Sequence, residues 1–244
     1  IHTPSGKPWC EVSAKYYLMD LLPEQQKIWA SIPNDKTSIE REKNEDIRAR
    51  PLYGNYLKAS YGLHIHTNGS KTATVRGTTG FYQPNHSFTE KSKDLTSKIL
   101  CSMKEIINSD EAYAQWDVDT VPRVEDKGEN RVAEFPSTII EVGFHTNALD
   151  AAALQNEKFR LLASKGMAKG LKLYKEGTAC TPFKIDSIPA SSGPQSSQFP
   201  YQVNYSGNPT FPVVMHFEPV KCAPGWTCLT GTRSTTSTSS PLTF

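Results

Sequence analysis

The sequence has no run of the roughly 18 to 20 consecutive apolar residues that a membrane-spanning helix requires, and its mean hydropathy of -0.50 agrees. It also lacks an excess of charge of one sign, because 27 Lys and Arg stand against 25 Asp and Glu, a net charge of +2. Such a near-neutral surface has no general basic field for nucleic acid. We therefore expect no transmembrane segment and no nucleic-acid partner.

Cysteine pairs of the zinc-ribbon type are lacking as well. The five cysteines are scattered and no CxxC pair occurs, which argues against a structural cysteine–zinc site. Cys222 and Cys228 enclose a short loop. They could form a disulfide in an oxidising compartment or remain two independent thiols. The odd cysteine count does not suit a fully bridged secreted protein.

The apolar residues that are present, 37% of the chain, suffice for a core and follow helical and strand periods. Residues 11–30 show helical spacing that Pro23 ends or kinks. Residues 33–48 are charged and predict an exposed loop, and residues 51–59 a short helix. An alternating run at 61–69 stops in Asn-Gly, which predicts a strand and a turn.

The middle of the chain alternates between strand and helix patterns. A second strand is expected at 78–82 and an amphipathic helix at 89–109. Residues 137–144 are apolar on both faces, as in a buried parallel strand, and residues 151–174 read as one long helix. This order predicts an α/β fold with a twisted, mostly parallel sheet flanked by helices.

The composition changes after Gly177. Residues 177–198 are rich in Pro, Ser and Gly and predict a linker, and residues 199–244 predict a small all-β module. The module ends in a tract too polar to finish a core, so it is incomplete or followed by a disordered linker. Residues 1–176 form the expected α/β domain, and the chain reads as a piece of a longer one.

Two polar segments follow predicted strands, HIHTN at 64–68 and EVGFHTN at 141–147. In open α/β sheets the carboxyl ends of strands form the active-site crevice. Glu141 lies inside an apolar strand, where a carboxylate is costly unless it is paired, hydrogen-bonded or near a metal. The residues alone leave open whether Glu141 is functional or a satisfied structural carboxylate.

Several motifs agree in order and spacing with one known family: an Arg-to-Asn step, a strand carrying a histidine, a Pro-x4-Glu-x-Gly-Phe strand and the helix after it. The matching residues are Arg50, Asn55, His66, Pro136, Glu141, Gly143, Phe144, Asn147, Leu154, Phe159, Arg160, Ala163, Gly170 and Tyr174. From residue 11 to about residue 175 the chain resembles the zinc-dependent N-acetylmuramoyl-L-alanine amidases that lyse bacterial cell walls.

The resemblance implies Zn²⁺-dependent hydrolysis of the amide between N-acetylmuramic acid and L-alanine in peptidoglycan. It makes Glu11 and His66 zinc ligands and Glu141 the catalytic base. A catalytic zinc keeps a position for water, whose pKa it lowers, while Glu141 takes and returns the proton. Without the resemblance, Glu11 could be a solvated first-turn residue and His66 a structural one.

Three further residues are expected to bind substrate. His64 lies two residues before His66 on the same strand face, Asn68 follows at the strand end, and His145 follows the second strand. The alternatives are that His64 simply packs and that His145 is a surface-loop histidine.

The chain departs from the family at one point. The family's first zinc ligand is a His in a D-P-G-H-G-G turn, and no such motif occurs here. We expect this ligand, and the strand before it, upstream of Ile1, with His2 as the less favoured equivalent.

Two rival functions stay open. One is a catalytically inactive amidase-like module that binds peptidoglycan or regulates an active enzyme; the other is a zinc carboxypeptidase, for which no basic residue for the terminal carboxylate can be identified. The resemblance places the protein in the bacterial cell envelope, periplasmic or secreted, with the C-terminal β module anchoring it to the wall or to a protein partner.

Overall fold

The computed structural model describes residues 3, 6–33, 38–189, 202–210, 212–217, 224–225, 231–236 and 242–243. The chain divides into two compact units, Ile1–Gly177 and Thr178–Phe244. Across the described segments, every helix is too short or too polar to cross a bilayer.

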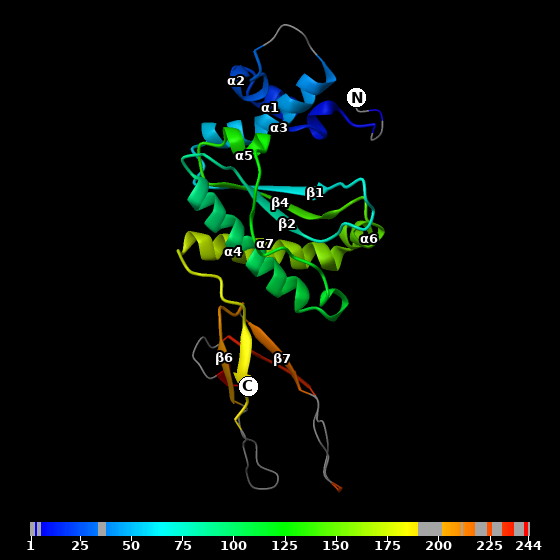
Figure 1. Ribbon diagram of the computed structural model, residues 1–244, viewed down its shortest axis with the longest axis vertical. Helices are drawn as coiled ribbons and strands as arrows, with labels where there is room; N and C mark the ends of the chain where they lie inside the picture. Colours follow the sequence, from blue (N-terminus) through cyan, green and yellow to red (C-terminus); the bar gives the residue numbers. More distant parts are fainter. Residues whose placement is uncertain are drawn as a thin grey trace. The chain divides into compact units, whose positions relative to one another are not determined.

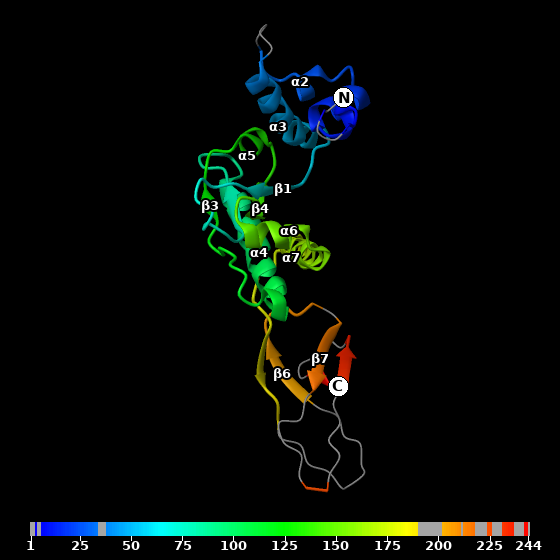
Figure 2. The same ribbon diagram turned by 90° about the vertical axis from the view of Figure 1, so that its right-hand side faces the viewer.

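The first unit is built on a four-stranded sheet with the order β1-β4-β2-β3 (Figures 1 and 2). The strands are β1 (Gly62–Asn68), β2 (Thr79–Tyr82), β3 (Arg123–Val124) and β4 (Ser137–Phe144). β1 runs parallel to the central strand β4, whereas β2 runs antiparallel to β4 and parallel to β3. The predicted strands at 61–69, 78–82 and 137–144 are confirmed, as is the α/β fold class.

Helices α4 (Thr89–Asn108) and α7 (Glu157–Lys175) cover one face of this sheet (Figure 1). The largest apolar cluster of the unit lies between them and β4 and includes Leu95, Ile99 and Phe159, all fully buried. The predicted single helix at 151–174 is wrong in one respect, because α6 (Ala148–Gln155) ends before α7 begins. The Asn156 side chain accepts a hydrogen bond from the Phe159 N–H and caps α7, so the chain turns there.

The N-terminal part consists of η1 (Trp9–Glu11), α1 (Ala14–Leu21), α2 (Gln26–Trp29) and α3 (Ile39–Tyr56). The helix predicted at 11–30 does end just before Pro23. The exposed loop predicted at 33–48 is wrong, because α3 starts at Ile39 and includes the short helix expected at 51–59. Ser38 caps it by accepting the Arg41 N–H.

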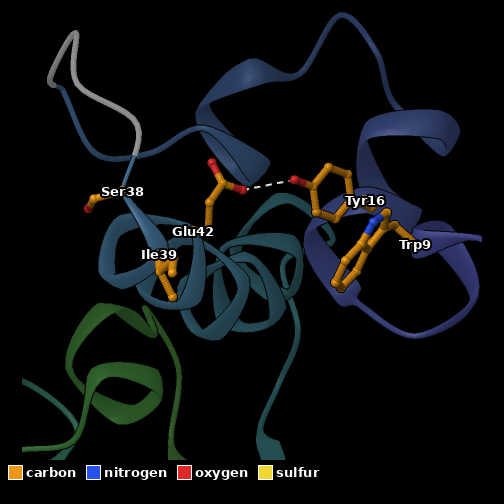
Figure 3. A pocket seen from close by; sticks show the side chains of 5 residues that line it. All are labelled: Trp9, Tyr16, Ser38, Ile39 and Glu42. Atoms are coloured by element: carbon orange, nitrogen blue, oxygen red, sulfur yellow. Dashed lines mark hydrogen bonds between the residues drawn. The ribbon is translucent and has the colours of Figure 1, made fainter. Parts of the chain in front are cut away.

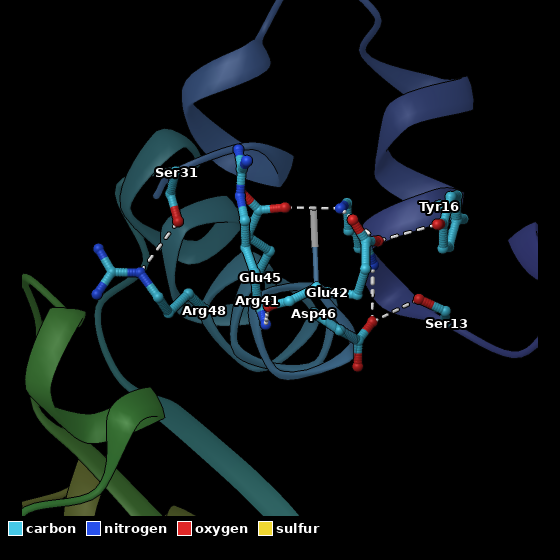
Figure 4. Close-up of polar contacts among 10 residues, drawn as sticks. Ser13, Tyr16, Ser31, Arg41, Glu42, Glu45, Asp46 and Arg48 are labelled. Carbon is cyan, nitrogen blue, oxygen red and sulfur yellow. Dashed lines mark hydrogen bonds and ion pairs between the residues drawn. The ribbon is translucent and has the colours of Figure 1, made fainter. Parts of the chain in front are cut away.

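Ion pairs explain why a segment so poor in apolar residues is helical. Lys15 Nζ on α1 lies 2.7 Å from Glu42 Oε2 and 2.6 Å from Glu45 Oε2 on α3 (Figure 4). Tyr16 donates its hydroxyl to Glu42 Oε2 at 2.9 Å, and the Ser13 hydroxyl donates to Asp46 at 2.6 Å. The charged face of α3 is therefore used to hold α1.

This cluster predicts an acid sensitivity. The hydrogen bond from Lys15 lowers the pKa of Glu42 below its ordinary value. A carboxyl whose folded-state pKa is depressed stabilises the fold above its unfolded pKa, about 4.3 for Glu, and this stabilisation is lost as the pH falls through the folded value. In Glu42→Gln the thermal midpoint should therefore fall less between about pH 5 and pH 3 than in the wild type. Exposed Glu24→Gln is the control, and superimposable wild-type and Glu42→Gln curves would contradict the assignment.

The described residues of the second unit form two small antiparallel sheets. One joins β5 (Lys184–Ser187), β6 (Gln202–Ser206) and β9 (Leu242–Thr243), and the other joins β7 (Val213–Phe217) and β8 (Gly231–Thr235). Their shared apolar cluster contains Val203, Val213 and Leu242. β5 falls within the segment expected to be a linker and pairs with β6, and no strand was predicted there.

Two of the cysteines that the structure describes are disulfide-bonded. Cys101 on α4 and Cys180 in the second unit are each disulfide-bonded. Cys222 and Cys228, for which a bridge was one of two expectations, lie outside the described residues.

Candidate active site

A row of three polar side chains crosses the sheet on the face away from α4 and α7. His66 on β1 is the register partner of Glu141 on β4, and Glu141 is the register partner of Thr79 on β2. Residues directly opposite on adjacent strands share a face, whereas Ile140 and Val142 point to the opposite, apolar face. The structure thus brings His66 and Glu141 side by side.

A carboxylate from a different element closes the His66 side of the row. Glu129 lies on α5 (Gly128–Val132), is 3% exposed, and its Oε2 accepts a hydrogen bond from His66 Nε2 at 2.6 Å. Its Oε1 lies 2.9 Å from Arg50 Nη1 and 3.5 Å from His64 Nδ1. Glu129 is therefore held by three cationic or imidazole groups at once.

The Arg-to-Asn step of the sequence has a structural purpose here. Arg50 on α3 pairs with Glu129 and also with Asp46 on its own helix, at 2.7 Å. Asn55, one turn later on α3, donates its amide to the Val132 carbonyl at 2.8 Å and accepts the Glu134 N–H at 2.7 Å. The two residues together fix α5, and with it Glu129, over the end of β1.

Burial and neighbouring groups shift the pKa values of His66, His64 and Glu129. The hydrogen bond to Glu129 raises the pKa of His66, whereas burial lowers the pKa of His64. Burial alone would raise the pKa of Glu129, but the hydrogen bonds from His66 and Arg50 and the charge of His64 outweigh it and lower that pKa. Glu129 is therefore ionised and acts as the anionic partner of His66.

Glu141 is in the opposite situation. Burial raises its pKa, and only the charges of His66 and Lys127 act against that rise. Its Oε2 is buried and, within the described ranges, has no hydrogen-bond partner. A buried carboxylate that the fold does not satisfy is a candidate for proton transfer.

Glu11 is the last residue of η1. Its side chain is half-exposed, and its carboxylate is 3.7 Å from Lys7 Nζ. Among the described residues, no hydrogen bond or ion pair links Glu11 to His66 or to Glu141. Its role as a zinc ligand stays a prediction that rests on the resemblance.

Of the three predicted substrate-binding residues, Asn68 and His145 lie at the carboxyl ends of β1 and β4, and His64 lies nearer the start of β1. His64 is largely buried and forms a 3.2 Å hydrogen bond with Ser137 Oγ. The Asn68 carbonyl accepts the His145 N–H at 2.9 Å, and His145 Nδ1 lies 3.1 Å from Thr67 Oγ1 at the surface. The strand ends are thus gathered at one edge, and the substrate contacts stay predictions.

Sequence reasoning missed Glu129. The helix that carries it has five residues, GENRV, too few to show a helical period, and its flanks are charged. A signal was nevertheless available, because the matched motif singled out Arg50 without giving it an anionic partner, and that partner is Glu129.

Zinc suits part of this site. An imidazole and a carboxylate are ordinary zinc ligands, and the His66–Glu129 pair supplies one of each. Among the residues that the structure describes, however, no three His, Cys, Asp or Glu side chains are gathered so that they could hold a metal ion. The described residues therefore do not fit a complete three-ligand zinc centre; His2, one candidate for the third ligand, lies outside them.

A cavity of about 500 Å³ lies away from this row, between η1, α1 and the start of α3. It is lined by Trp9, Tyr16, Ser38, Ile39 and Glu42 (Figure 3). Glu42 and Tyr16 are the ionisable residues among those that line the cavity. The Glu42 carboxylate already accepts hydrogen bonds from Lys15 and Tyr16. The cavity contains none of the predicted site residues.

Comparison with known proteins gives a family match. The model of a family described as N-acetylmuramoyl-L-alanine amidase matches residues 18–173, which include the whole row and α5. No curated protein sequence matches the chain.

Solved structures give similar folds at low sequence identity. The CwlD amidase of Clostridioides difficile, solved in complex with the GerS lipoprotein, is 18% identical, with 67% of this chain and 84% of that chain covered and a TM-score of 0.50. An N-acetylmuramoyl-L-alanine amidase of Clostridium difficile 630 is 21% identical (55% and 67% covered, TM-score 0.47). The catalytic domain of CwlV from Bacillus (Paenibacillus) polymyxa var. colistinus is 20% identical (67% and 81%, 0.45).

Proposed function

Because the chain belongs to the N-acetylmuramoyl-L-alanine amidase family, we propose that it hydrolyses the amide bond between N-acetylmuramic acid and L-alanine in peptidoglycan. The observation that carries this proposal is the buried carboxylate of Glu141 beside His66 on the adjacent strands β4 and β1, with an Oε2 that has no hydrogen-bond partner among the described residues. Family membership supplies the substrate, and this placement supplies a group able to move a proton.

Glu141 acts as the general base and then as the general acid. It takes a proton from a water molecule whose oxygen forms the new bond to the amide carbonyl carbon. It then gives that proton to the L-alanine nitrogen as the carbon–nitrogen bond breaks, so that a free carboxylate and a free amine leave. A pKa raised by burial suits both halves of this cycle, because the proton is accepted readily and returned readily.

We also propose Zn²⁺ as the cofactor, with His66 as one ligand. Family membership and the imidazole–carboxylate chemistry of the site support this. The carboxylate ligand has two candidates, Glu11 from the resemblance and Glu129 from its 2.6 Å contact with His66.

Zinc content separates these assignments. The complete protein should contain zinc and His66→Ala should lose most of it, because removing a ligand leaves too few to hold the ion. Glu11→Gln and Glu129→Gln, compared by elemental analysis after dialysis, identify the carboxylate by which of them loses metal, and exposed Glu24→Gln is the control. Equal zinc in the wild type and in His66→Ala would sink the assignment of His66.

The proposed place of action is the bacterial cell envelope, periplasmic or secreted. The substrate supports it, and so do the disulfide-bonded Cys101 and Cys180, because disulfides persist in oxidising compartments. We propose that the β strands after residue 199 bind the cell wall or a protein partner. The CwlD amidase was solved with a lipoprotein partner, and a partner of this kind suits the module.

A further inference from the structure

Thr79 is the third member of the row, and the mechanism above gives it no role. The residue is 4% exposed. Its hydroxyl oxygen is buried and meets no hydrogen-bond partner in the part of the chain that the structure describes. A buried hydroxyl without a partner costs free energy, so such a group needs a reason other than stability.

The neighbouring Thr78 shows that the fold can satisfy a threonine hydroxyl at this strand end. Thr78 points to the opposite face, donates to the Val142 carbonyl at 2.7 Å and accepts from Trp116 Nε1 at 2.9 Å. Thr79 has the same side chain one residue later and neither contact. The difference lies in the face of the sheet, because Thr79 shares its face with Glu141.

Two cross-strand neighbours therefore each carry a buried polar atom without a hydrogen-bond partner among the described residues. Thr79 Oγ1 and Glu141 Oε2 belong to directly opposed residues on β2 and β4, whose Cβ atoms in such pairs lie about 4.5–5.5 Å apart. His66, at the β1 end of the row, keeps a third of its side chain exposed, so the row is reached from solvent on the His66 side.

The chemistry of the two groups is complementary. An ionised carboxylate only accepts hydrogen bonds, whereas a hydroxyl can donate one. In amide hydrolysis the water gives up a proton while negative charge develops on the carbonyl oxygen, which needs a donor. Glu141 suits the first task and Thr79 the second.

We propose that the Thr79 hydroxyl donates a hydrogen bond to the carbonyl oxygen of the scissile amide while Glu141 accepts the proton of the attacking water. This inference rests on the proposed amidase function. It makes Thr79 a catalytic residue that contacts substrate, and it accounts for a buried hydroxyl that has no partner among the described residues.

The test compares three variants of the complete protein acting on a soluble muramoyl peptide. Thr79→Val removes the hydroxyl and keeps the β-branched shape, Thr79→Ser keeps the hydroxyl, and Thr78→Val makes the same change at the neighbouring, satisfied hydroxyl. For each variant, kcat, KM and the thermal midpoint are recorded.

Thr79→Val should lower kcat by roughly 10²-fold, as loss of one such donor does. KM should change little, because the bond forms mainly in the transition state. Its thermal midpoint should stay or rise, since the wild-type hydroxyl is unpaired, and Thr79→Ser should keep most of kcat. Thr78→Val should instead lower the midpoint and leave kcat per folded molecule unchanged, because it breaks two hydrogen bonds of the fold.

An active wild type with an equally active Thr79→Val overturns the role of Thr79 and leaves the amidase function standing. The same holds if Thr79→Ser is as slow as Thr79→Val, since then shape and not the hydroxyl matters. A folded wild type that releases no peptide is a different failure, which removes the proposed function and the role of Thr79 with it.

Discussion

Glu141→Gln is expected to lower the turnover of peptidoglycan by roughly 10²- to 10⁴-fold, the usual contribution of a general base. The amide of glutamine keeps the shape of the side chain but cannot take the proton of the water. Because burial raises the pKa of Glu141, its ionised form destabilises the fold at neutral pH, so the neutral glutamine should keep or raise the thermal midpoint. Activity and stability should thus move in different directions.

The measurement is release of L-alanine-terminated stem peptides from purified peptidoglycan by the complete protein, with zinc content and thermal midpoint recorded alongside. Glu134→Gln, the same change at an exposed glutamate just before β4, is the matched control and should retain wild-type turnover. An active Glu141→Gln would remove Glu141 from the mechanism. A folded, zinc-loaded wild type that releases nothing but binds peptidoglycan would favour the inactive binding module.

The sheet could be predicted from the sequence because its strands carry their own signal. β4 is apolar on both faces, as a strand between two neighbours must be. β1 alternates between apolar and polar residues, which identifies it as a strand, although the apolar Ile65 is 58% exposed and the polar His64 is largely buried. The apolar run of β4 therefore reports its surroundings, whereas the alternation of β1 reports only that the segment is a strand.

α3 could not be predicted in the same way. Its first half is held by ion pairs with a partner helix, such as that between Lys15 and Glu45, and apolar packing is confined to its second half, around the buried Ala49. A window of sequence contains the charges of α3 but not their partners 27 and 30 residues away. Contacts with distant residues therefore make this segment helical, although its composition alone predicted an exposed loop.

The residues of the candidate site also differ in whether the sequence could predict them. His66 and Glu141 were found because both lie on strands whose ends must meet at one edge. Glu129 was not found, because its place depends on Arg50 and Asn55, which reach α5 from α3 across 79 and 77 residues. Thr79 was not found either, since an unsatisfied hydroxyl is visible only when its surroundings are known.

Gly170→Ala is expected to be the most destabilising of the substitutions considered. A Cβ at Gly170 on α7 would lie 2.4 Å from the Cα and 2.8 Å from the N of Ile99 on α4. One turn earlier, a Cβ at Gly166 would lie 2.6 Å from the Cα of Met103. These are backbone atoms that no rotamer change can move, so the two helices would have to separate.

Separating α4 from α7 disturbs the apolar cluster that supports β4 from behind. Overpacking of this kind costs about 3 kcal/mol, well above the gain of roughly 0.5–1 kcal/mol that alanine brings to a free helix. For a unit of this size the thermal midpoint should fall by roughly 6 to 12 °C. Ser164→Ala, on the exposed side of α7, is the control and should lie within about 0.5 kcal/mol of the wild type.

Gly170→Ala also tests whether the packing of α4 on α7 only stabilises the fold or also affects the reaction at Glu141. Gly170 lies behind the sheet, on the α4 side, whereas Glu141 lies on the opposite face of β4. Gly170→Ala should therefore lose activity only in proportion to the protein that has unfolded, and at low temperature its turnover per folded molecule should match the wild type. A midpoint at or above that of the wild type would show that α4 and α7 do not pack through these glycines. A loss of turnover without a loss of stability would show that the spacing of the two helices sets the position of Glu141.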